Sequence, residues 1–295
     1  SEEDVVAKFD HLPQQTKDYF LTNYLDKTFD INGLTVKFDE LSLKKNVLVY
    51  GKALDFTEHV FKTYLSKADK VIDFELSIDE TETVTSPEAH FFVAEELKRR
   101  EVQVTSLAPR FCGEFQKGID YIGDLEQFEK ELSEHAQIAR FFSYKLSIHS
   151  GSDKFSVFPI IGKYTEGLFH LKTAGTNWLE AIRVIAATNP DLYRRMHAYA
   201  EEHFDEALKY YHITPDLDSI QPLDQTPDTE LPNYMDNDAA RQLIHVTYGI
   251  LLTATDQSGR SLFKDEFFKT LIENEDKYIQ ALITHIGKHI ELLGL

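Results

Sequence analysis

The sequence has little cysteine and lacks long apolar runs. Its 295 residues include one cysteine, Cys112, so no disulfide bond can form within the chain, as is usual in a reducing cytoplasm. It contains no run of about 18 apolar residues that could cross a membrane, and its N-terminus lacks the charged-then-apolar pattern of a signal peptide. We therefore predict a cytoplasmic protein that does not insert into a membrane.

Basic residues are also scarce, with 31 lysines and arginines against 50 acidic residues, which gives a formal net charge of −19. So acidic a chain repels nucleic acids and anionic membranes, and we exclude both as general partners. A small anionic substrate remains compatible, because a local group of lysines can reverse the potential inside a cleft. The sequence leaves the oligomeric state open.

Short apolar runs alternate with helical patterns along most of the chain, which predicts an α/β fold. Strands are expected at residues 46–50, 71–79, 102–108, 144–149 and 168–172. Helices are expected at residues 57–65, 86–100, 125–142, 177–187 and 190–212, and two more at 262–293. Residues 241–247 form either a sixth strand or a helix, because periodicity cannot separate the two over so short a run. The rhythm of strand and helix is typical of a TIM-barrel-like parallel β/α barrel with C-terminal helices.

A closed barrel needs eight such units, so either strands hide in the first 45 residues or the barrel is incomplete at the N-terminus. Residues 1–45 predict a helical stretch broken at Pro13 and a hairpin around Asn32-Gly33. We therefore divide the chain into an N-terminal segment of uncertain structure, residues 1–45, and a barrel-like catalytic domain with a helical extension, residues 46–295.

Two predicted strands carry polar side chains on one face. Lys145 and His149 alternate with apolar residues along one strand, as His170 and Lys172 do along the next. A period of two places each lysine and its histidine on the same face. Because burying unpaired charge costs several kcal/mol, that face is expected to line a polar site where the strands end.

Several sequence blocks come in an order that resembles the tagaturonate epimerase family. They are SIDETET at 77–83, APRFCGEF at 108–115, KGIDYIGD at 117–124, HSGSDKFS at 149–156 and HLKTAGTNWLE at 170–180. The resemblance covers roughly residues 70–295 and is poor before residue 65. It implies a metal-dependent epimerase that interconverts tagaturonate and fructuronate in hexuronate breakdown. The family's N-terminal portion, with further site residues including an Asp-His pair, is not found in this sequence.

The implied reaction inverts a carbinol carbon two bonds from the ketone carbon, whose C–H is not acidic enough for simple proton abstraction. Retro-aldol cleavage, rotation and re-addition would invert it, with a Lewis acid and a general acid/base. We assign Glu80 as the acid/base, with Asp79 as the alternative; either could instead cap the loop before Ser86. His149 and His170 are the expected metal ligands, and their alternative is a structural, hydrogen-bonded pair. Two imidazoles with a carboxylate suit Mn, Fe, Co, Ni or Zn better than Mg.

Cationic and turn residues near these strands are the expected substrate contacts. Lys145 and Lys172 could hold a carboxylate or an oxyanion, or form ion pairs with the acidic strand at Asp73 or Glu75. The remaining predicted substrate contacts are Arg110, Ser150, Ser152 and Lys154. His245 would lie near the metal if residues 241–247 were a strand. The other helical histidines, including His285 and His289, are expected to be surface or satisfied residues.

Two further functions fit the same residues. One is another isomerase or aldolase acting on sugar-acid ketoses, which would use the same chemistry. The other is a non-catalytic sugar-acid-binding protein, if the chain is complete as it stands.

Overall fold

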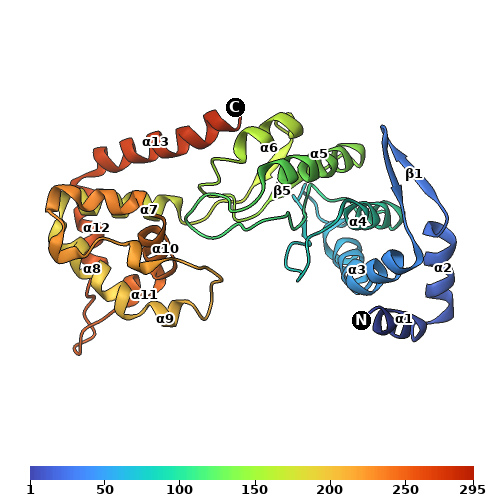
Figure 1. Cartoon of the computed structure of the whole chain (residues 1–295), viewed down its shortest axis with the longest axis horizontal. Helices are drawn as coiled ribbons and strands as arrows, with labels where there is room; N and C mark the ends of the chain where they lie inside the picture. The colour runs from blue at the N-terminus through green and yellow to red at the C-terminus, as the bar shows by residue number, and fades with distance from the viewer. The chain divides into compact units, whose positions relative to one another are not determined.

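The computed structural model describes all 295 residues and divides them into two compact units. The first unit contains Ser1–Cys112, Asp124–Ile148 and Lys163–Leu171, and the second contains Gly113–Gly123, His149–Gly162 and Lys172–Leu295. Figure 1 labels many of the helices and some of the strands. The division of the chain at residue 45 stays a prediction. In the structure one helix of the first unit runs through residue 45 without a break.

The first unit begins with helices and a hairpin whose ends follow local sequence signals. Ser1 caps the first helix through a capping box, and Pro13 precedes the second. The hairpin turns at Asn32-Gly33, both with positive φ, as predicted. These elements are α1 (Glu2–Asp10), α2 (Gln14–Tyr24), β1 (Thr28–Ile31), β2 (Leu34–Lys37), α3 (Glu40–Val60) and the π-helical turn η1 (Phe61–Leu65).

The centre of the first unit is a parallel sheet with four strands in the order β3-β4-β5-β6. Its strands are β3 (Glu75–Ser77), β4 (Ser106–Ala108), β5 (Lys145–Ile148) and β6 (Phe169–Leu171), and the helices between them are α4 (Pro87–Arg99), α5 (Leu125–Phe141) and α6 (Phe158–Thr165). Leu107, Leu146 and Ile148 are fully buried, and Ser86 caps α4 before Pro87 as predicted. Helical connections are what parallel neighbours require.

The structure corrects the predicted strand bounds. All four strands are shorter than predicted, most of all β3 and β4 against the predicted 71–79 and 102–108. They form a four-stranded parallel sheet, and the barrel stays a prediction. Residues 46–50, predicted as a strand, belong to α3, which starts at the cap Asp39. The buried residues of that helix, among them Leu43, Val47, Tyr50 and Leu54, repeat at helical spacing. The prediction failed because an apolar run as short as Val47–Tyr50 does not distinguish a buried strand from a buried helix.

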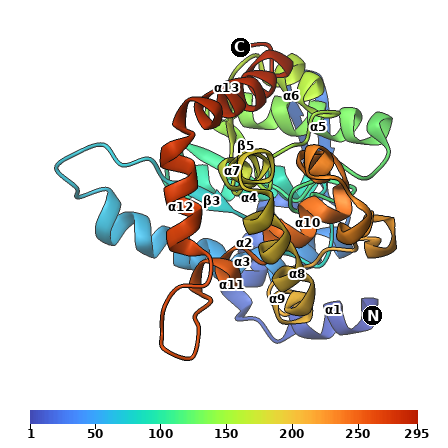
Figure 2. The same cartoon turned by 90° about the vertical axis from the view of Figure 1, so that its left-hand side faces the viewer.

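Helices build the second unit around α7 (Thr176–Thr188), whose Leu179, Ile182 and Ile185 are fully buried. Figure 2 shows α7 among α8, α10, α12 and α13, which all contact it. The other elements are α8 (Pro190–Glu202), α9 (Phe204–Ala207), η2 (Leu217–Ser219), η3 (Leu223–Gln225), η4 (Asp228–Asp236), α10 (Asp238–Val246), α11 (Tyr248–Thr253), α12 (Lys264–Glu273) and α13 (Glu275–Leu292). The two predicted C-terminal helices are confirmed. Residues 241–246 belong to α10, so no sixth strand forms there. The helix predicted at 190–212 ends earlier, at Glu202, and the short α9 follows it.

A buried hydrogen-bonded chain of polar rings lies in the core of the first unit. The Tyr144 hydroxyl lies 2.6 Å from His90 Nε2, and His90 Nδ1 lies 2.9 Å from His135 Nδ1. Burial raises the pKa of Tyr144, so its hydroxyl keeps the hydrogen that it donates to His90. Burial also lowers the pKa of His135 to about 4 and that of His90 well below its usual value. Both histidines are therefore neutral at pH 7.

These neutral histidines predict that the first unit loses stability in mild acid. In the unfolded chain His135 titrates near 6.5 but in the folded chain at about 4, so the unfolded state gains protons first and stability falls as the pH drops below 6.5. For His135 alone the loss between pH 7 and pH 5 is about 2 kcal/mol. Urea unfolding of His135→Gln should show a shallower dependence on pH. The matched change His59→Gln, at an exposed position, should leave the dependence as it was; an equal change in both variants would contradict the prediction.

Candidate functional site

Polar side chains from all four strands of the sheet gather around His170 in the first unit. His170 pairs with Ser147 across β6 and β5, and its Nδ1 lies 2.9 Å from Ser147 Oγ and 2.7 Å from Glu75 Oε2 on β3. The Ser106 hydroxyl of β4 donates to the same Glu75 oxygen at 2.5 Å. Glu75, Ser147 and His170, from three of the strands, thus meet on one polar side of the sheet.

The pairing with Glu75 determines which nitrogen of His170 is available. An ionised carboxylate only accepts hydrogen bonds, so His170 Nδ1 carries the hydrogen and Nε2 carries the lone pair. The His170 side chain is 47% exposed, so Nε2 can reach a ligand. A histidine that donates one N–H to a carboxylate and offers the other nitrogen is the usual arrangement of a metal-binding imidazole.

The predicted acid/base and two predicted cations also belong to the first unit. Glu80 is exposed in the loop after β3, and the neighbouring Asp79 accepts a hydrogen bond from the Ser77 hydroxyl. The Arg110 backbone N–H donates to Thr85 Oγ1 at 3.0 Å, and the Arg110 guanidinium donates to the Thr81 carbonyl. Arg110 therefore holds the loop that follows Glu80. Lys145 is exposed at the start of β5.

The remaining predicted residues lie in the second unit, where two of them prove to be structural. Lys154 is fully buried, and its ammonium donates to the carbonyls of Gln116, Ile119 and Ser152 at 2.8, 2.5 and 3.0 Å. All three of its donors are therefore used, and none remains for a substrate. Ser152 Oγ likewise donates to the carbonyl of Ala174 and accepts from its N–H. The prediction that Lys154 and Ser152 bind substrate is corrected accordingly.

His149, Ser150 and Lys172 remain accessible. His149 and Ser150 are half-buried in the turn after β5, and Lys172 is exposed directly after β6. The Lys172 carbonyl accepts a hydrogen bond from Gly151 N–H at 2.9 Å, so the two strand ends are tied together in the second unit. Since His149 belongs to the second unit and His170 to the first, their joint role as ligands stays a prediction.

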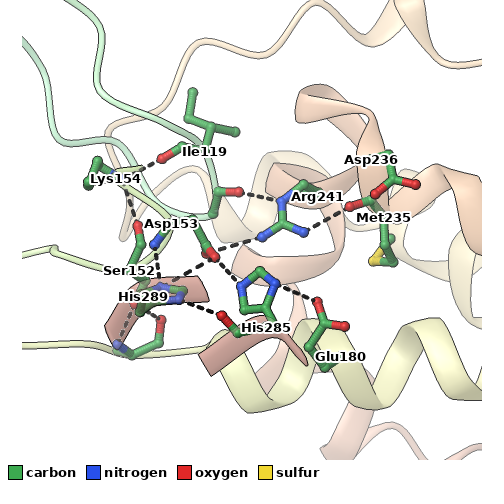
Figure 3. Close-up of polar contacts among 12 residues, drawn as sticks. Ile119, Ser152, Asp153, Lys154, Glu180, Met235, Asp236, Arg241, His285 and His289 are labelled. Carbon is green, nitrogen blue, oxygen red and sulfur yellow. Dashed lines mark hydrogen bonds and ion pairs between the residues drawn. The ribbon is translucent and has the colours of Figure 1, made fainter. Parts of the chain in front are cut away.

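A buried network centred on Asp153 follows in the same turn (Figure 3). Asp153 Oδ1 accepts from His285 Nε2 at 2.5 Å, and Oδ2 lies 3.1 Å from Arg241 Nη2. His285 Nδ1 in turn lies 3.3 Å from Glu180 Oε1. Burial raises the pKa of Asp153, but the hydrogen bond from His285 and the charge of Arg241 outweigh it and hold this pKa below its usual value. Asp153 is therefore a buried carboxylate anion that connects the turn to α10 and α13.

Asp153, His285 and His289 place potential metal-ligand atoms within 4.8 Å of one another. Their lone pairs are already engaged, however. His289 Nδ1 lies 2.9 Å from the His285 carbonyl, so it carries the hydrogen, and Nε2 accepts from Asp153 N–H at 3.1 Å. A cation here would have to break this bond and also displace the Arg241 guanidinium. Of the two groups, His170 with Glu75 is therefore the better fit for a metal.

His245 differs from its predicted setting. It lies on helix α10 rather than on a strand, and it is 5% exposed. Burial and the positive charge of Lys117 lower its pKa to about 4, so the imidazole is neutral at pH 7. Its predicted place beside the metal, which depended on a sixth strand, is therefore not supported.

Sequence reasoning missed the Asp153 network. A signal was present, because His285 and His289 stand four residues apart and so share a face of α13. Nothing local connects them with Asp153, which is 132 residues from His285.

Comparisons with known proteins decide the family. The sequence profile of UxaE, tagaturonate epimerase, matches residues 1–293. The chain belongs to the tagaturonate epimerase family. The match also includes the first 65 residues, which showed little resemblance by their motifs alone. Relatives in this family are named as epimerases, which are isomerases.

Relatives of known sequence and structure agree with this assignment. The chain is 48% identical over 273 residues to the tagaturonate/fructuronate epimerase of Thermotoga maritima. This alignment covers 92% of the present chain and 55% of the Thermotoga protein. It superimposes with a TM-score of 0.98 on two crystal structures of the fructuronate-tagaturonate epimerase UxaE from Cohnella laeviribosi. The native structure is 55% identical to this chain, and the complex with one glycerol is 56% identical. Each superposition covers 100% of this chain and 60% of the Cohnella chain.

The chain thus spans little more than half the length of these relatives. No helix of the structure is long and apolar enough to cross a membrane.

The Asp153 network predicts a large loss of stability on removing its central charge. Asp153→Asn leaves Arg241 buried without its partner, and breaking such a pair typically costs 3–5 kcal/mol. Asp236→Asn is the matched control, since the Asp236 carboxylate also pairs with an arginine but is 66% exposed, and it should cost about 1 kcal/mol or less. Urea unfolding of the two variants measures this, and equal losses would show that the Asp153 network is not a stabilising core.

Proposed function

We propose that the whole protein containing this chain interconverts tagaturonate and fructuronate with the help of a divalent metal. Membership of the family supports the reaction. The observation that carries the assignment of the site is the pairing of Glu75 with His170 Nδ1, which leaves Nε2 available at the end of a parallel sheet. The names of the relatives favour an epimerase over an aldolase or a binding protein.

The four parallel strands are proposed to form part of a β/α barrel. The chain covers 60% of the crystallised relative, so further strands would come from the portion it does not cover. In a barrel the active site lies at the carboxyl ends of the strands. His149 directly follows β5 in the sequence, and Lys172 directly follows β6.

The reaction is proposed to follow a retro-aldol route. A base removes the proton from the hydroxyl on the carbon to be inverted, and the bond between that carbon and the ketose carbon next to the carbonyl breaks. An aldehyde and an enediolate result. The aldehyde rotates, the bond re-forms on its other face, and the new alkoxide takes back the proton. Atoms and electrons balance without an external oxidant or reductant.

The residues of this chain divide these tasks. Glu80 is proposed to carry the proton, because it is exposed beside the sheet and its loop is held by Arg110. His170, oriented by Glu75, would hold the metal, which when bound supplies a Lewis acid for the negative charge of the enediolate. His149 stays a predicted ligand. Lys145, Lys172 and Ser150 remain proposed contacts for the oxygens of the sugar. The donors suit Mn, Fe, Co, Ni or Zn.

The central test compares metal content and epimerisation in variants of His170. His170→Ala should lose both the metal and the conversion of fructuronate to tagaturonate, measured by elemental analysis and NMR on the whole protein. Glu75→Gln should weaken metal affinity by about 10- to 100-fold, since it loses the carboxylate that orients the imidazole. His59→Ala, an exposed histidine of the same unit, is the control. Full metal content and activity in His170→Ala would rule out its role as a ligand.

A second test concerns His149. His149→Ala should lose the metal but retain the fold, because a ligand at an open site contributes little to the core. Circular dichroism and elemental analysis of the same preparation separate the two effects. A folded variant that retains its metal and activity would show that His149 is structural.

A further inference from the structure

Two serines lie in the middle of the polar side of the sheet, and the proposed reaction gives neither of them a role. Ser106 belongs to β4 and Ser147 to β5, the two central strands. Glu75 and His170 belong to the two outer strands, β3 and β6. Hydrogen bonds connect these four side chains, one from each strand, in the order Ser106, Glu75, His170 and Ser147.

Glu75 and His170 reach each other across the two central strands. In a flat sheet, with neighbouring strands about 4.8 Å apart, the first and fourth strands would be about 14 Å apart, which is more than these two side chains can span. The Glu75 carboxylate nevertheless lies 2.7 Å from His170 Nδ1, so the sheet curves towards its polar side. Small side chains at the two central positions, Ser106 and Ser147, leave room for this contact.

Ser106 stands directly beside Glu75 and is held firmly by the core. The two residues are register partners on β3 and β4, and the Ser106 hydroxyl donates to Glu75 Oε2 at 2.5 Å. This is the same oxygen that accepts from His170 Nδ1. A hydrogen bond from a hydroxyl to a carboxylate is of the short, charge-assisted kind. Since Ser106 is 6% exposed and Leu107 and Ala108 after it are fully buried, the position of its hydroxyl is fixed.

The Glu75 carboxylate gains from such a support because its side chain is long and partly exposed. The side chain is 26% exposed, and a glutamate has several rotatable bonds that burial or binding must order. The Ser106 hydroxyl favours the one position in which Oε2 also accepts from His170. In that position the carboxylate keeps the imidazole hydrogen on Nδ1 and the lone pair on Nε2.

We propose that Ser106 is a positioning residue, which fixes the Glu75 carboxylate and thereby keeps the hydrogen of His170 on Nδ1. This inference rests on the proposed metal-dependent function and deepens it, because an imidazole oriented in this way is ready to bind a metal through Nε2. Ser106 acts through Glu75 and has no assigned contact with the metal or the sugar.

The nitrogen resonances of His170 report where its hydrogen lies, and they need neither metal nor substrate. The metal-free whole protein, labelled with 15N-histidine, is observed at about pH 8.5, where an ordinary imidazole is neutral. The unaltered protein should show the hydrogen on Nδ1, in resonances assigned by their loss in His170→Ala. Ser106→Ala should increase the share of the other tautomer several-fold, whereas Ser106→Thr, which keeps the hydroxyl, should behave as the unaltered protein.

The affinity for Zn²⁺, titrated against a chelator in the same proteins, gives a second readout. Ser106→Ala should weaken it by about 10-fold, the low end of the range for groups that orient a metal ligand. In a Glu75→Ala background the same change should have no further effect, because Ser106 acts through the carboxylate. Ser66→Ala, at an exposed serine of the first unit, is the control and should change neither the tautomer nor the affinity.

The tautomer decides the proposal. A hydrogen on Nε2 in the unaltered protein would overturn it, and so would an unchanged tautomer in Ser106→Ala, whatever the affinity. An equal loss of Zn²⁺ affinity in the Glu75→Ala background would also overturn it, since Ser106 would then act without the carboxylate.

Failure of the proposed function is distinguishable from failure of this inference. A protein without epimerase activity or bound metal whose His170 tautomer depends on Ser106 retains the positioning role. A metal-dependent epimerase whose His170 tautomer and Zn²⁺ affinity ignore Ser106 retains only the function.

Discussion

The second unit depends on one buried carboxylate, Asp153. Its desolvation is compensated by a guanidinium on α10 and an imidazole on α13, and its own N–H donates to a second imidazole of α13. Asp153 also has φ +63°, a conformation that is unfavourable for a side chain with a Cβ. The strain is tolerated because the carboxylate is directed into the network. Removing either partner would leave a charge in a site that water does not reach.

The turn that contains Asp153 organises the surrounding segments as well. Ser152 ties it to the backbone at Ala174, just before α7, and Lys154 ties it to the carbonyls of Gln116 and Ile119. Ser150 Oγ accepts a hydrogen bond from the ammonium of Lys117 at 3.1 Å. The residue order of the turn therefore matters: each side chain engages a different segment, and the loop that begins with His149 becomes a rigid support. Rigid support is what a ligand or substrate contact requires, since misplacement by about 1 Å can cost 10²-fold in rate.

Local signals in the sequence predicted helices better than strands. Ser86-Pro87 and the hairpin at Asn32-Gly33 act through their own backbone, so their positions followed from the residues themselves. Strands of three or four residues contain too little periodicity to set their ends. In the candidate site the polar face of His170 was predictable because alternation fixes which side chains share a face. Its contact with Glu75, 95 residues away, and the Asp153 network depend on tertiary packing that no local pattern encodes.

Lys154 shows how burial makes a charged side chain structural. The sequence alone placed Lys154, in the HSGSDKFS block at 149–156, among the expected substrate contacts. Burial lowers the pKa of Lys154 to about 8, and three carbonyls occupy its donors, so it holds the loop and offers nothing to a ligand. The ammonium of Lys154 therefore stabilises the turn, because a buried cation is costly unless hydrogen-bond acceptors surround it.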